Sequence, residues 1–551
     1  MGSVWYQVFP ERFANGDTRN DPDEFGSTVL PWDASWYDTS GEEIEAAWNR
    51  RLSDPTVFRY QPSTSGGAFD GVVFQRRYGG DLQGVVEQLD HLRSLGVDGL
   101  YLCPVFASRS LHKYDARDHR HVDPGFGPYD PEGFLETFRA PGDPYDETTW
   151  SWTAADRFLI DVVIPEAKRR GMRVMLDGVW NHVGLDHWAF RDVVENGKRS
   201  RFAGWFDARF DDNGDLAGWS GWSRANGPLP EFLQVSGDIN AGAKAHLFAV
   251  TRRWMDPNGD GDPSDGIDGW RLDVAAEIGR AFWVDWRKLV KSVNPDALIV
   301  AEIWHDADAW FDGTAFDSQM HYPFAFAATS WLGRTPGFGT RDFRTSLGAV
   351  NGRRPAVDLV QMTLLASHDT ERLASMLSNP RDVGYDQGAT RGDVWSGEYD
   401  PEPPKAALER SVLGAALQTV WEGAPMIYGG DEFGLPGADD PSNRAPIPWL
   451  SGGDVSVRDG YAGWFKLREH PVAGPVFRRG ATRILEHPSR RVLAVSRRLD
   501  GVRVVAVLNS SDAPVRIGPL LTRFGLREWL AVLPQTGQLQ ARSAVAWVSE
   551  R

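Results

Sequence analysis

The feature that most constrains the fold of this chain is a series of short apolar runs, each ending in polar or charged residues. The runs span 4–9, 99–106, 173–182, 269–275, 298–304, 359–369 and 424–432, with a weaker one at 316–322. Buried parallel strands read as continuous apolar runs. Helix-like patterns such as 81–96 and 158–171 lie between most of them and close on glycine, a common helix stop. The alternation predicts an α/β fold, a (β/α)₈ barrel with its active site at the C-terminal strand ends.

Two regions depart from this alternation. Residues 183–237 form a long, aromatic, turn-rich stretch after the third run, and they predict an inserted subdomain. After about residue 470 the runs become short and alternating, which is typical of a small antiparallel β domain. We therefore expect barrel segments at 1–182 and 238–470, the insertion at 183–237, and a C-terminal β-sandwich at 471–551.

Composition excludes several classes of function. The 551-residue chain has a net charge of −17, whereas nucleic acids and anionic membranes reward basic patches. No apolar run reaches about 18 residues, so we expect no membrane span. The start, MGSVWYQVF, shows no signal peptide, which favours a cytoplasmic location. Cys103 is the only cysteine, so we expect no intrachain disulfide and a buried, inert thiol.

Three carboxylates at the ends of different apolar runs carry the strongest chemical signal: Asp273, Glu302 and Asp369. Burying several carboxylates at one barrel mouth is costly and needs a reason. Cleavage of a glycosidic bond supplies one, since one carboxylate attacks the sugar while a neutral carboxylic acid protonates the leaving oxygen. Arg271 precedes Asp273 by two residues and points to the same face of a strand, where it would keep Asp273 ionised.

The segments DGVWNH, GWRLDVA, AEIW and SHD, in this order and spacing, resemble the four signature regions of the α-amylase family of glycoside hydrolases (family 13). The resemblance covers nearly the whole chain. YQVFPERFANGD, YGGDLQGVVEQLDHLRSLGV, HKYDARDH and AEIWHD are most similar to the group of neopullulanases, cyclomaltodextrinases and maltogenic amylases.

The resemblance implies roles for individual residues. Asp273 would be the nucleophile, Glu302 the general acid/base, and Asp369 the third carboxylate, which stabilises the transition state. The residues that would contact or support the sugar are Tyr114, Asp177, His182, Arg271, Trp304, His368 and Arg372. Trp304 sits where relatives tune α-1,4 against α-1,6 acceptance. For Tyr114 and the two histidines, core packing is the alternative.

The resemblance also implies a structural calcium site near the barrel's N-terminal edge. Its ligands would be Asn15, Asp17, Asn20, Asp21, the Gly79 carbonyl and Asp81. These groups offer the hard oxygen atoms that calcium prefers. An Asx-rich turn without metal is the alternative.

A second acidic loop, DPNGDGDPSDG, precedes the fourth run. Asp256, Asn258, Asp260 and Gly261 fit the start of an EF-hand loop, but Ile267 stands where the bidentate glutamate belongs. A solvated turn and a calcium loop of another kind, with Asp262 and Asp265 as further ligands, remain equally open. We expect this loop to enter at the N-terminal, stabilising face of the barrel and to take no part in bond cleavage.

Departures from the related group concern specificity and assembly. The chain starts at the first barrel strand, so a homodimer would not use the relatives' N-terminal accessory domain. DVAAE (273–277) replaces DVANE, and LPEF (229–232) replaces part of MPKLN, both near acceptor subsites. The long connection 107–156, with Trp150 and Trp152, either reshapes the cleft or covers the barrel edge.

The sequence thus predicts a retaining α-glucan hydrolase acting on α-1,4 bonds of malto-oligosaccharides or cyclic maltodextrins. The alternatives within this class are a hydrolase of pullulan or of a cyclic glucan with mixed α-1,4 and α-1,6 links, and a transglycosylase. A non-catalytic sugar-binding homologue is disfavoured, because such proteins commonly lose catalytic carboxylates and all three are present.

Overall fold

A computed structural model describes residues 2–21, 29–36, 76–222, 224–380, 402–449, 453–518, 520, 528–531 and 538–549. Its centre is a sheet of eight strands in the order β12-β11-β10-β5-β2-β1-β14-β13, all paired in parallel. A parallel bridge between Met320 and Met362 joins the two end strands and closes the barrel. The predicted (β/α)₈ barrel is confirmed.

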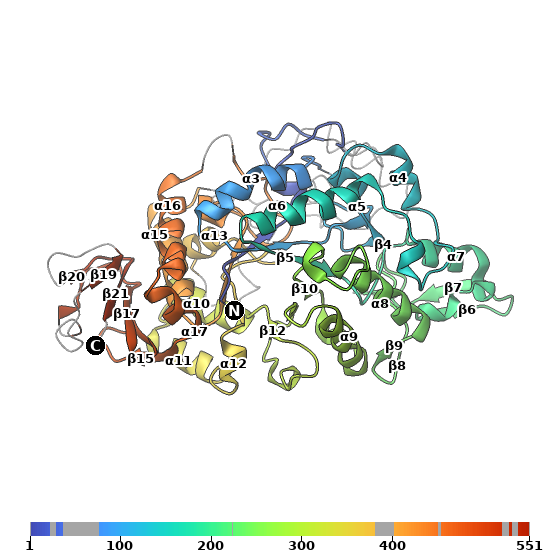
Figure 1. Ribbon diagram of the computed structural model, residues 1–551. Helices are drawn as coiled ribbons and strands as arrows, with labels where there is room; N and C mark the ends of the chain where they lie inside the picture. The colour runs from blue at the N-terminus through green and yellow to red at the C-terminus, as the bar shows by residue number, and fades with distance from the viewer. Residues whose placement is uncertain are drawn as a thin grey trace, which may run out of the picture.

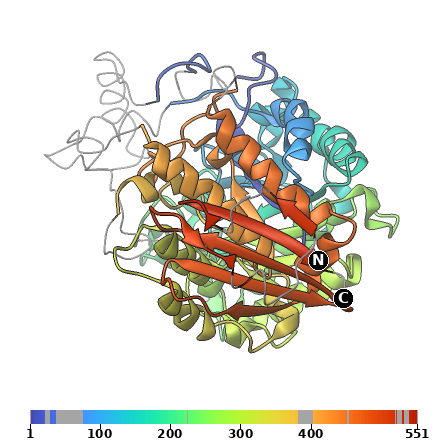
Figure 2. The ribbon, with the colours of Figure 1, turned by 90° about the vertical axis from the view of Figure 1, so that its left-hand side faces the viewer.

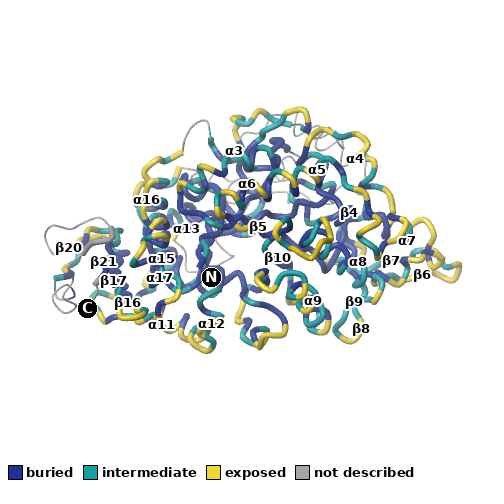
Figure 3. The backbone as a smooth tube through the Cα atoms, in the orientation of Figure 1, coloured by how far each residue is buried: buried dark blue, intermediate teal, exposed yellow. Residues whose placement is uncertain are grey.

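All eight predicted runs contribute a barrel strand, and most of these strands are buried along their whole length (Figures 1 and 3). The strands are shorter than the apolar runs because several runs continue past the sheet as buried loop. The bounds are β1 Trp5–Val8, β2 Gly99–Leu102, β5 Arg173–Gly178, β10 Gly269–Leu272, β11 Leu298–Ala301, β12 Ser318–Gln319, β13 Met362–Thr363 and β14 Ala424–Tyr428.

Helices follow most strands and cover the outside of the barrel. The main ones are α3 Leu82–Ser94, α6 Ile164–Arg169, α8 Ala241–Met255, α9 Arg280–Val293, α10 Tyr322–Leu332, α11 Thr340–Gly348, α12 Pro355–Asp358, α13 Leu373–Ser378, α15 Lys405–Val420 and α16 Val455–Phe465. Asp81 caps the N-terminus of α3 by accepting the Gly84 N–H with its side chain, and Gly96 follows the helix with φ +88°. The glycine is the stop that the sequence predicts, and the Asp81 cap satisfies an amide that the first helical turn leaves free.

The predicted helix at 158–171 is interrupted. α5 (Ala154–Phe158) runs into a five-residue π-helical turn (Leu159–Val163) before α6 begins. Pro165 explains the wider turn, because proline lacks an amide hydrogen and its ring clashes with the preceding helical carbonyl.

The stretch after β5 leaves the barrel, as expected of an insertion. It contains α7 (Trp188–Asn196) and two hairpins, β6–β7 (Ala208–Phe210, Leu216–Trp219) and β8–β9 (Gln234–Val235, Asp238–Ile239). A further hairpin, β3–β4 (Phe106–Ser108, Ala116–Val122), and the short helix α4 (Pro131–Glu136) lie in the long connection after β2. Figure 1 shows these hairpins at the end of the molecule opposite the C-terminal sheet.

The C-terminal region is antiparallel, which confirms the predicted β domain. After α17 (Ala473–Arg479), five strands pair in the order β15-β16-β17-β21-β19, and β18 pairs with β20 in a small second sheet. The bounds are β15 Ala481–Leu485, β16 Val492–Leu499, β17 Val502–Asn509, β18 Val515–Arg516, β19 Glu528–Ala531, β20 Gln538–Leu539 and β21 Ser543–Ser549. One face of the larger sheet packs against α15 and α17 (Figure 2). No described helix is both long enough and apolar enough to cross a bilayer.

Candidate active site

Asp273 and Glu302 each stand one residue beyond the end of a barrel strand. The Asp273 N–H donates to the Gly178 carbonyl at 3.1 Å, and the Glu302 N–H donates to the Leu272 carbonyl at 2.9 Å. Both backbones therefore remain tied to a neighbouring strand, which fixes the direction of the side chains. The two side chains are buried, whereas Asp369, in the loop after β13, is about a quarter exposed.

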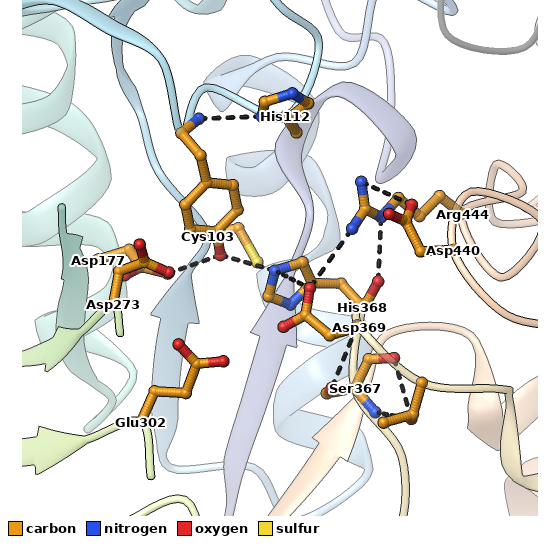
Figure 4. Close-up of polar contacts among 12 residues, drawn as sticks. Cys103, His112, Asp177, Asp273, Glu302, Ser367, His368, Asp369, Asp440 and Arg444 are labelled. Atoms are coloured by element: carbon orange, nitrogen blue, oxygen red, sulfur yellow. Dashed lines mark hydrogen bonds and ion pairs between the residues drawn. The ribbon is translucent and has the colours of Figure 1, made fainter. Parts of the chain in front are cut away.

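The Arg271 guanidinium, fully buried on β10, joins these carboxylates. Its Nη1 lies 2.9 Å from Asp177 Oδ1 and 3.0 Å from Asp273 Oδ1. Its Nη2 lies 3.1 Å from Glu302 Oε2 and 4.0 Å from Asp369 Oδ2. Figure 4 shows the carboxylates converging from several strands. One buried cation thus faces four acids, so its charge cannot offset all of them.

The pKa values reflect this imbalance. Burial, then the charge of Glu302, raises the pKa of Asp273 well above its ordinary value, while Arg271 opposes the shift. Burial and the same glutamate raise the pKa of Asp369 to about 7. The attraction of Arg271, which we expected to keep Asp273 ionised, is therefore only one of the opposing contributions to the pKa of Asp273. Like charges crowded in a buried site are typical of carboxylates that exchange protons during a reaction.

Tyr114 and His368 form the other side of the site. Their rings stack in parallel with centroids 5.4 Å apart, and Tyr114 Oη lies 2.6 Å from His368 Nε2 and 3.0 Å from Asp177 Oδ2. Burial lowers the pKa of His368 well below its ordinary value, so its imidazole is neutral at pH 7. Tyr101, on β2, donates to Asp177 at 2.6 Å. These contacts hold the Tyr114 ring and the His368 ring in fixed positions.

His182 lies at the border with the inserted region. It is buried, its Nε2 has no hydrogen-bond partner among the described residues, and its ring stacks on Trp222 at 5.7 Å. Burial lowers the pKa of His182 to about 3. A neutral ring nitrogen in this place is suited to a hydroxyl group.

Two groups hold the Glu302 carboxylate besides Arg271. The Val274 N–H donates to Oε2 at 2.8 Å, and the Trp304 indole N–H donates to Oε1 at 3.1 Å. Val274 has φ +39° and ψ +43°, an uncommon conformation for a β-branched residue. Trp304 in turn stacks on Tyr322 with ring centroids 3.9 Å apart.

Arg372 is placed apart from these carboxylates. Its guanidinium donates to the carbonyls of Gly429 and Asn443 and lies 3.2 Å from Asp431. Substrate contact by Arg372 stays a prediction. Arg444, which sequence reasoning missed, lies 3.4 Å from Asp369 Oδ1 and donates to the His368 carbonyl at 3.0 Å.

Gln7 was also missed: its amide nitrogen lies 2.8 Å from His368 Nδ1. Tyr101 and Gln7 carried a local signal, since each is a polar side chain within an apolar strand run. The sequence around Arg444 contains no such signal.

The first acidic cluster is compact. Asp81 accepts the backbone N–H groups of Gly16, Asp17 and Gly84, and the Asn20 amide at 3.0 Å. Asp17 pairs with Arg19 on the surface.

The other half of this cluster lies around Asp21. Asn15 donates to Asp21 at 2.8 Å, and Asp21 Oδ1 lies 2.1 Å from where a Gly79 Cβ would stand, so only glycine fits there. The amide oxygens of Asn15 and Asn20 are buried without a hydrogen-bond partner in the described part of the chain.

The second loop satisfies its acids locally. Asp256 accepts the N–H groups of Gly259 and Gly261, Asp260 accepts that of Asp262, and Asp262 accepts that of Ser264. One oxygen of Asp265 is buried without a partner among the described residues. The loop leads to Asp268, whose N–H donates to the Val174 carbonyl at 2.7 Å, so it enters at the N-terminal end of β10. Across the described residues, no group of three or more His, Cys, Asp or Glu side chains is arranged to hold a metal.

Comparison with known proteins places this geometry in a family. The description "Alpha amylase, catalytic domain" matches residues 7–135 and 159–458. The chain is 34% identical over 453 residues to neopullulanase 2 of Thermoactinomyces vulgaris, covering 81% of this chain and 59% of that protein. It is 31% identical over 515 residues to a cyclomaltodextrinase of Bacillus sp, covering 93% and 73%.

A solved structure matches from end to end. The cyclic α-maltosyl-(1→6)-maltose hydrolase of Arthrobacter globiformis, in ligand-free form, superposes with a TM-score of 0.71 at 27% identity, covering 100% of this chain and 99% of that one. The family match spans the barrel and all the strand-end carboxylates, and the relatives are named glycosidases. The chain therefore belongs to the α-amylase family of glycoside hydrolases.

Proposed function

We propose that the protein is a retaining hydrolase of α-glucans. The observation that carries this proposal is the pair Asp273 and Glu302, which stand at the ends of adjacent strands and meet at one buried guanidinium. Asp273 attacks the anomeric carbon as Glu302 gives its proton to the glycosidic oxygen, forming a covalent glycosyl-enzyme. Glu302 then takes a proton from water, which releases the sugar with its original configuration.

The surrounding residues hold the sugar during these steps. Tyr114 supplies a flat face held by its stack with His368. The Nε2 atom of His182, which has no partner among the described residues, and the carboxylate of Asp369 are positioned to bind hydroxyl groups. Both ring nitrogens of His368 contact protein groups, Tyr114 and Gln7, so His368 acts by holding the Tyr114 ring. The fixed donors around Glu302, from Val274 and Trp304, keep its carboxylate aimed between the strands.

The anomeric configuration of the first product tests the mechanism. Proton NMR of fresh digests of maltotriose should show the α-anomer first, followed by slow mutarotation, because double displacement retains configuration. A first product of β configuration contradicts the assignment of Asp273 as nucleophile.

The preferred substrate is one of two classes. Malto-oligosaccharides or cyclic maltodextrins are supported by relatives named cyclomaltodextrinase and maltogenic α-amylase. A cyclic glucan with mixed α-1,4 and α-1,6 links is supported by the end-to-end match to the Arthrobacter globiformis hydrolase. Initial rates on maltotriose, cyclodextrins, pullulan and cyclic α-maltosyl-(1→6)-maltose separate them, with the ratio of hydrolysis to transfer read from the product lengths.

We further propose a structural calcium ion in the first acidic cluster. The unpartnered amide oxygens of Asn15 and Asn20, with Asp21 beside Gly79, fit the oxygen ligands that calcium takes. Asp17 and Asp81, which the sequence also predicts as ligands, already bind Arg19 and backbone amides. When bound, the ion would supply rigidity to this edge of the barrel. EDTA should lower the melting temperature of the protein, and Asp21→Asn should remove most of that effect.

A cytoplasmic location is proposed on the support of a relative named intracellular maltogenic amylase of Bacillus subtilis, 31% identical over 452 residues. Fractionation of the source cells tests it, since activity confined to the medium contradicts it.

A further inference from the structure

A cleft of about 820 Å³ lies at the end of the barrel opposite the catalytic carboxylates. Its walls include α11, α12, the turns that lead into β13 and β14, and the edge strand β15 of the C-terminal sheet. Figure 1 shows α11, α12 and β15 at the lower left of the molecule. Because the strands are parallel, the turns before β13 and β14 mark the N-terminal face of the barrel. The cleft therefore shares nothing with the active site.

The deep part of the cleft is acidic. Asp358 is buried, and its carboxylate accepts the Gly352 N–H at 2.8 Å. Glu422 is half-buried, and it accepts the Asn351 amide at 3.4 Å. The charge of Glu422 contributes to raising the pKa of Asp358, after burial, to about 6, so the two acids are close enough to interact. Asp358 is therefore ionised at pH 7.5, and both carboxyl groups accept hydrogen bonds.

The outer part of the cleft is basic. Besides the exposed acid Glu486, it is lined by three exposed arginines: Arg344 on α11, Arg479 at the end of α17 and Arg483 on β15. Among the described residues, no acidic side chain lies within ion-pair distance of any of them. In a chain of net charge −17, three such guanidinium groups around one opening form an unusual set of free donors.

Two further polar atoms in the wall lack a partner. The indole nitrogen of Trp421, a residue that is 4% exposed, and the hydroxyl of Thr482 are both buried without a hydrogen bond to any described residue. Leaving a buried donor unsatisfied costs roughly 1–3 kcal/mol in a folded protein. Both atoms lie behind the surface of the wall, so they are not contact points for a ligand in the cleft.

The charges select the class of ligand. A simple anion would meet the carboxylates of Asp358 and Glu422, and a simple cation would meet three arginines. A neutral molecule with many hydroxyl groups uses both sets, because a hydroxyl group can donate to a carboxylate and accept from a guanidinium. The volume lies within the range of pockets that hold ligands of a few hundred daltons, about 300–1,000 Å³.

We propose that this cleft is a second, non-catalytic binding site for a neutral saccharide, held between the foot of the barrel and the C-terminal domain. The proposal does not depend on the reaction assigned to Asp273 and Glu302. The two parts of the chain already share hydrogen bonds, such as that from Arg497 to the Val420 carbonyl at 3.0 Å. Binding in the cleft would add a further link and stabilise their contact by mass action.

Calorimetric titration of the full chain carrying Asp273→Asn tests the proposal, because the substitution prevents turnover of the sugar. Maltotriose should bind to two classes of site. Adding Glu422→Gln or Arg483→Ala should weaken one class by about 10-fold or more, the loss of one charge-assisted hydrogen bond, and leave the other class unchanged. Arg516→Ala, an exposed arginine on β18, is the matched control and should change neither class.

Trehalose and glycerol, titrated in parallel, distinguish a site for glucose oligomers from a site for any polyol. In the active enzyme, the cleft substitutions should leave kcat on maltotriose unchanged. A single class of sites with every polyol, insensitive to Glu422→Gln and Arg483→Ala, overturns the proposal. If the proposed function were wrong and the catalytic end bound no maltotriose, the class sensitive to these substitutions would still remain.

Discussion

Strand β10 has acidic residues near both of its ends, and the surroundings of these residues differ. At one end the acids are hydrogen-bonded within a surface loop, and at the other they are buried together. At the N-terminal end, Asp256 is half-buried, Asp260 and Asp262 are exposed, and all three accept backbone N–H groups of their own loop. At the C-terminal end, Asp273 is buried against Glu302 with one shared arginine. The first arrangement stabilises a loop, because each charge is solvated or hydrogen-bonded. The second keeps charges in competition, which costs stability and makes proton exchange easy.

The largest expected difference is in catalysis. Asp273→Asn should lower kcat on maltotriose by at least about 10⁴-fold, because a cooperating group of residues fails when its nucleophile is removed. Asp262→Asn, at the other end of the strand, should leave kcat unchanged. Circular dichroism and melting curves of both variants check that the fold is kept. An Asp273→Asn enzyme that retains a tenth of the activity would contradict the assignment.

Removing the shared cation should affect stability. Arg271→Met leaves Asp177, Asp273 and Glu302 without their common partner, which should lower the free energy of unfolding by about 3–5 kcal/mol at pH 8. The loss should shrink at pH 4–5, since the pKa values of Asp177 and Asp273 are raised and these two carboxyl groups take up protons as the pH falls. Lys168→Met, at the opposite end, breaks the 3.6 Å pair with Asp268 and two hydrogen bonds to the Ser264 and Gly266 carbonyls, and it should cost only about 1–2 kcal/mol. Urea titrations at the two pH values measure the free energy of unfolding of both variants. Equal losses for the two variants would contradict the proposed difference between the two ends of β10.

Asp369 tests the cost of the crowded charges directly. Its pKa is raised to about 7 in the folded protein, above the value of about 3.9 in an unfolded chain. Between these pH values the folded state holds the extra proton, so stability falls as pH rises through this window. Asp369→Asn should therefore unfold with a free energy about 1–2 kcal/mol higher than wild type at pH 8, after allowing for partial exposure, and with no difference near pH 3. A variant no more stable than wild type at pH 8 would show that Asp369 is not under strain.

The smallest effect is expected at the acidic loop itself. Asp260→Ala removes the acceptor for the Asp262 N–H, and it should lower the melting temperature by roughly 1–2 °C with kcat unchanged. If calcium binds this loop, the rise of the melting temperature with added calcium should also become smaller. A large fall in kcat with unchanged melting would place the loop in the active site.

The barrel could be predicted because its signal is local. Each apolar run, such as 269–275, reports burial on both faces of a strand, and the alternation with helices leaves few topologies. Strand ends could not be predicted, because a run remains apolar wherever it stays buried. The run at 359–369 shows this, since only Met362–Thr363 pair as strand while Leu364 and Leu365 pack as buried loop.

The residues of the active site likewise divide into those with a local sequence signal and those without one. Asp273, Glu302 and Asp369 were predictable because each directly follows an apolar run. Arg444 was not, because it reaches Asp369 from a loop 75 positions later in the chain, and only the folded structure brings the two together. Likewise, the excess of acids over cations around Arg271 depends on distances between strands that no local pattern contains.

The position of Arg271 has a consequence for how this site can change by mutation. Asp177, Asp273, Glu302 and Asp369 all lie within 4.0 Å of one guanidinium. When any one of them is neutralised, the positive charge of Arg271 offsets the negative charges of the other three more completely. The effects of substitutions at these positions should therefore be strongly non-additive. A substitution that lowers activity on its own can have little further effect when another of the four acids is already substituted. The four acids are therefore constrained to change together, and new specificities are more accessible through substitutions in loops outside this group.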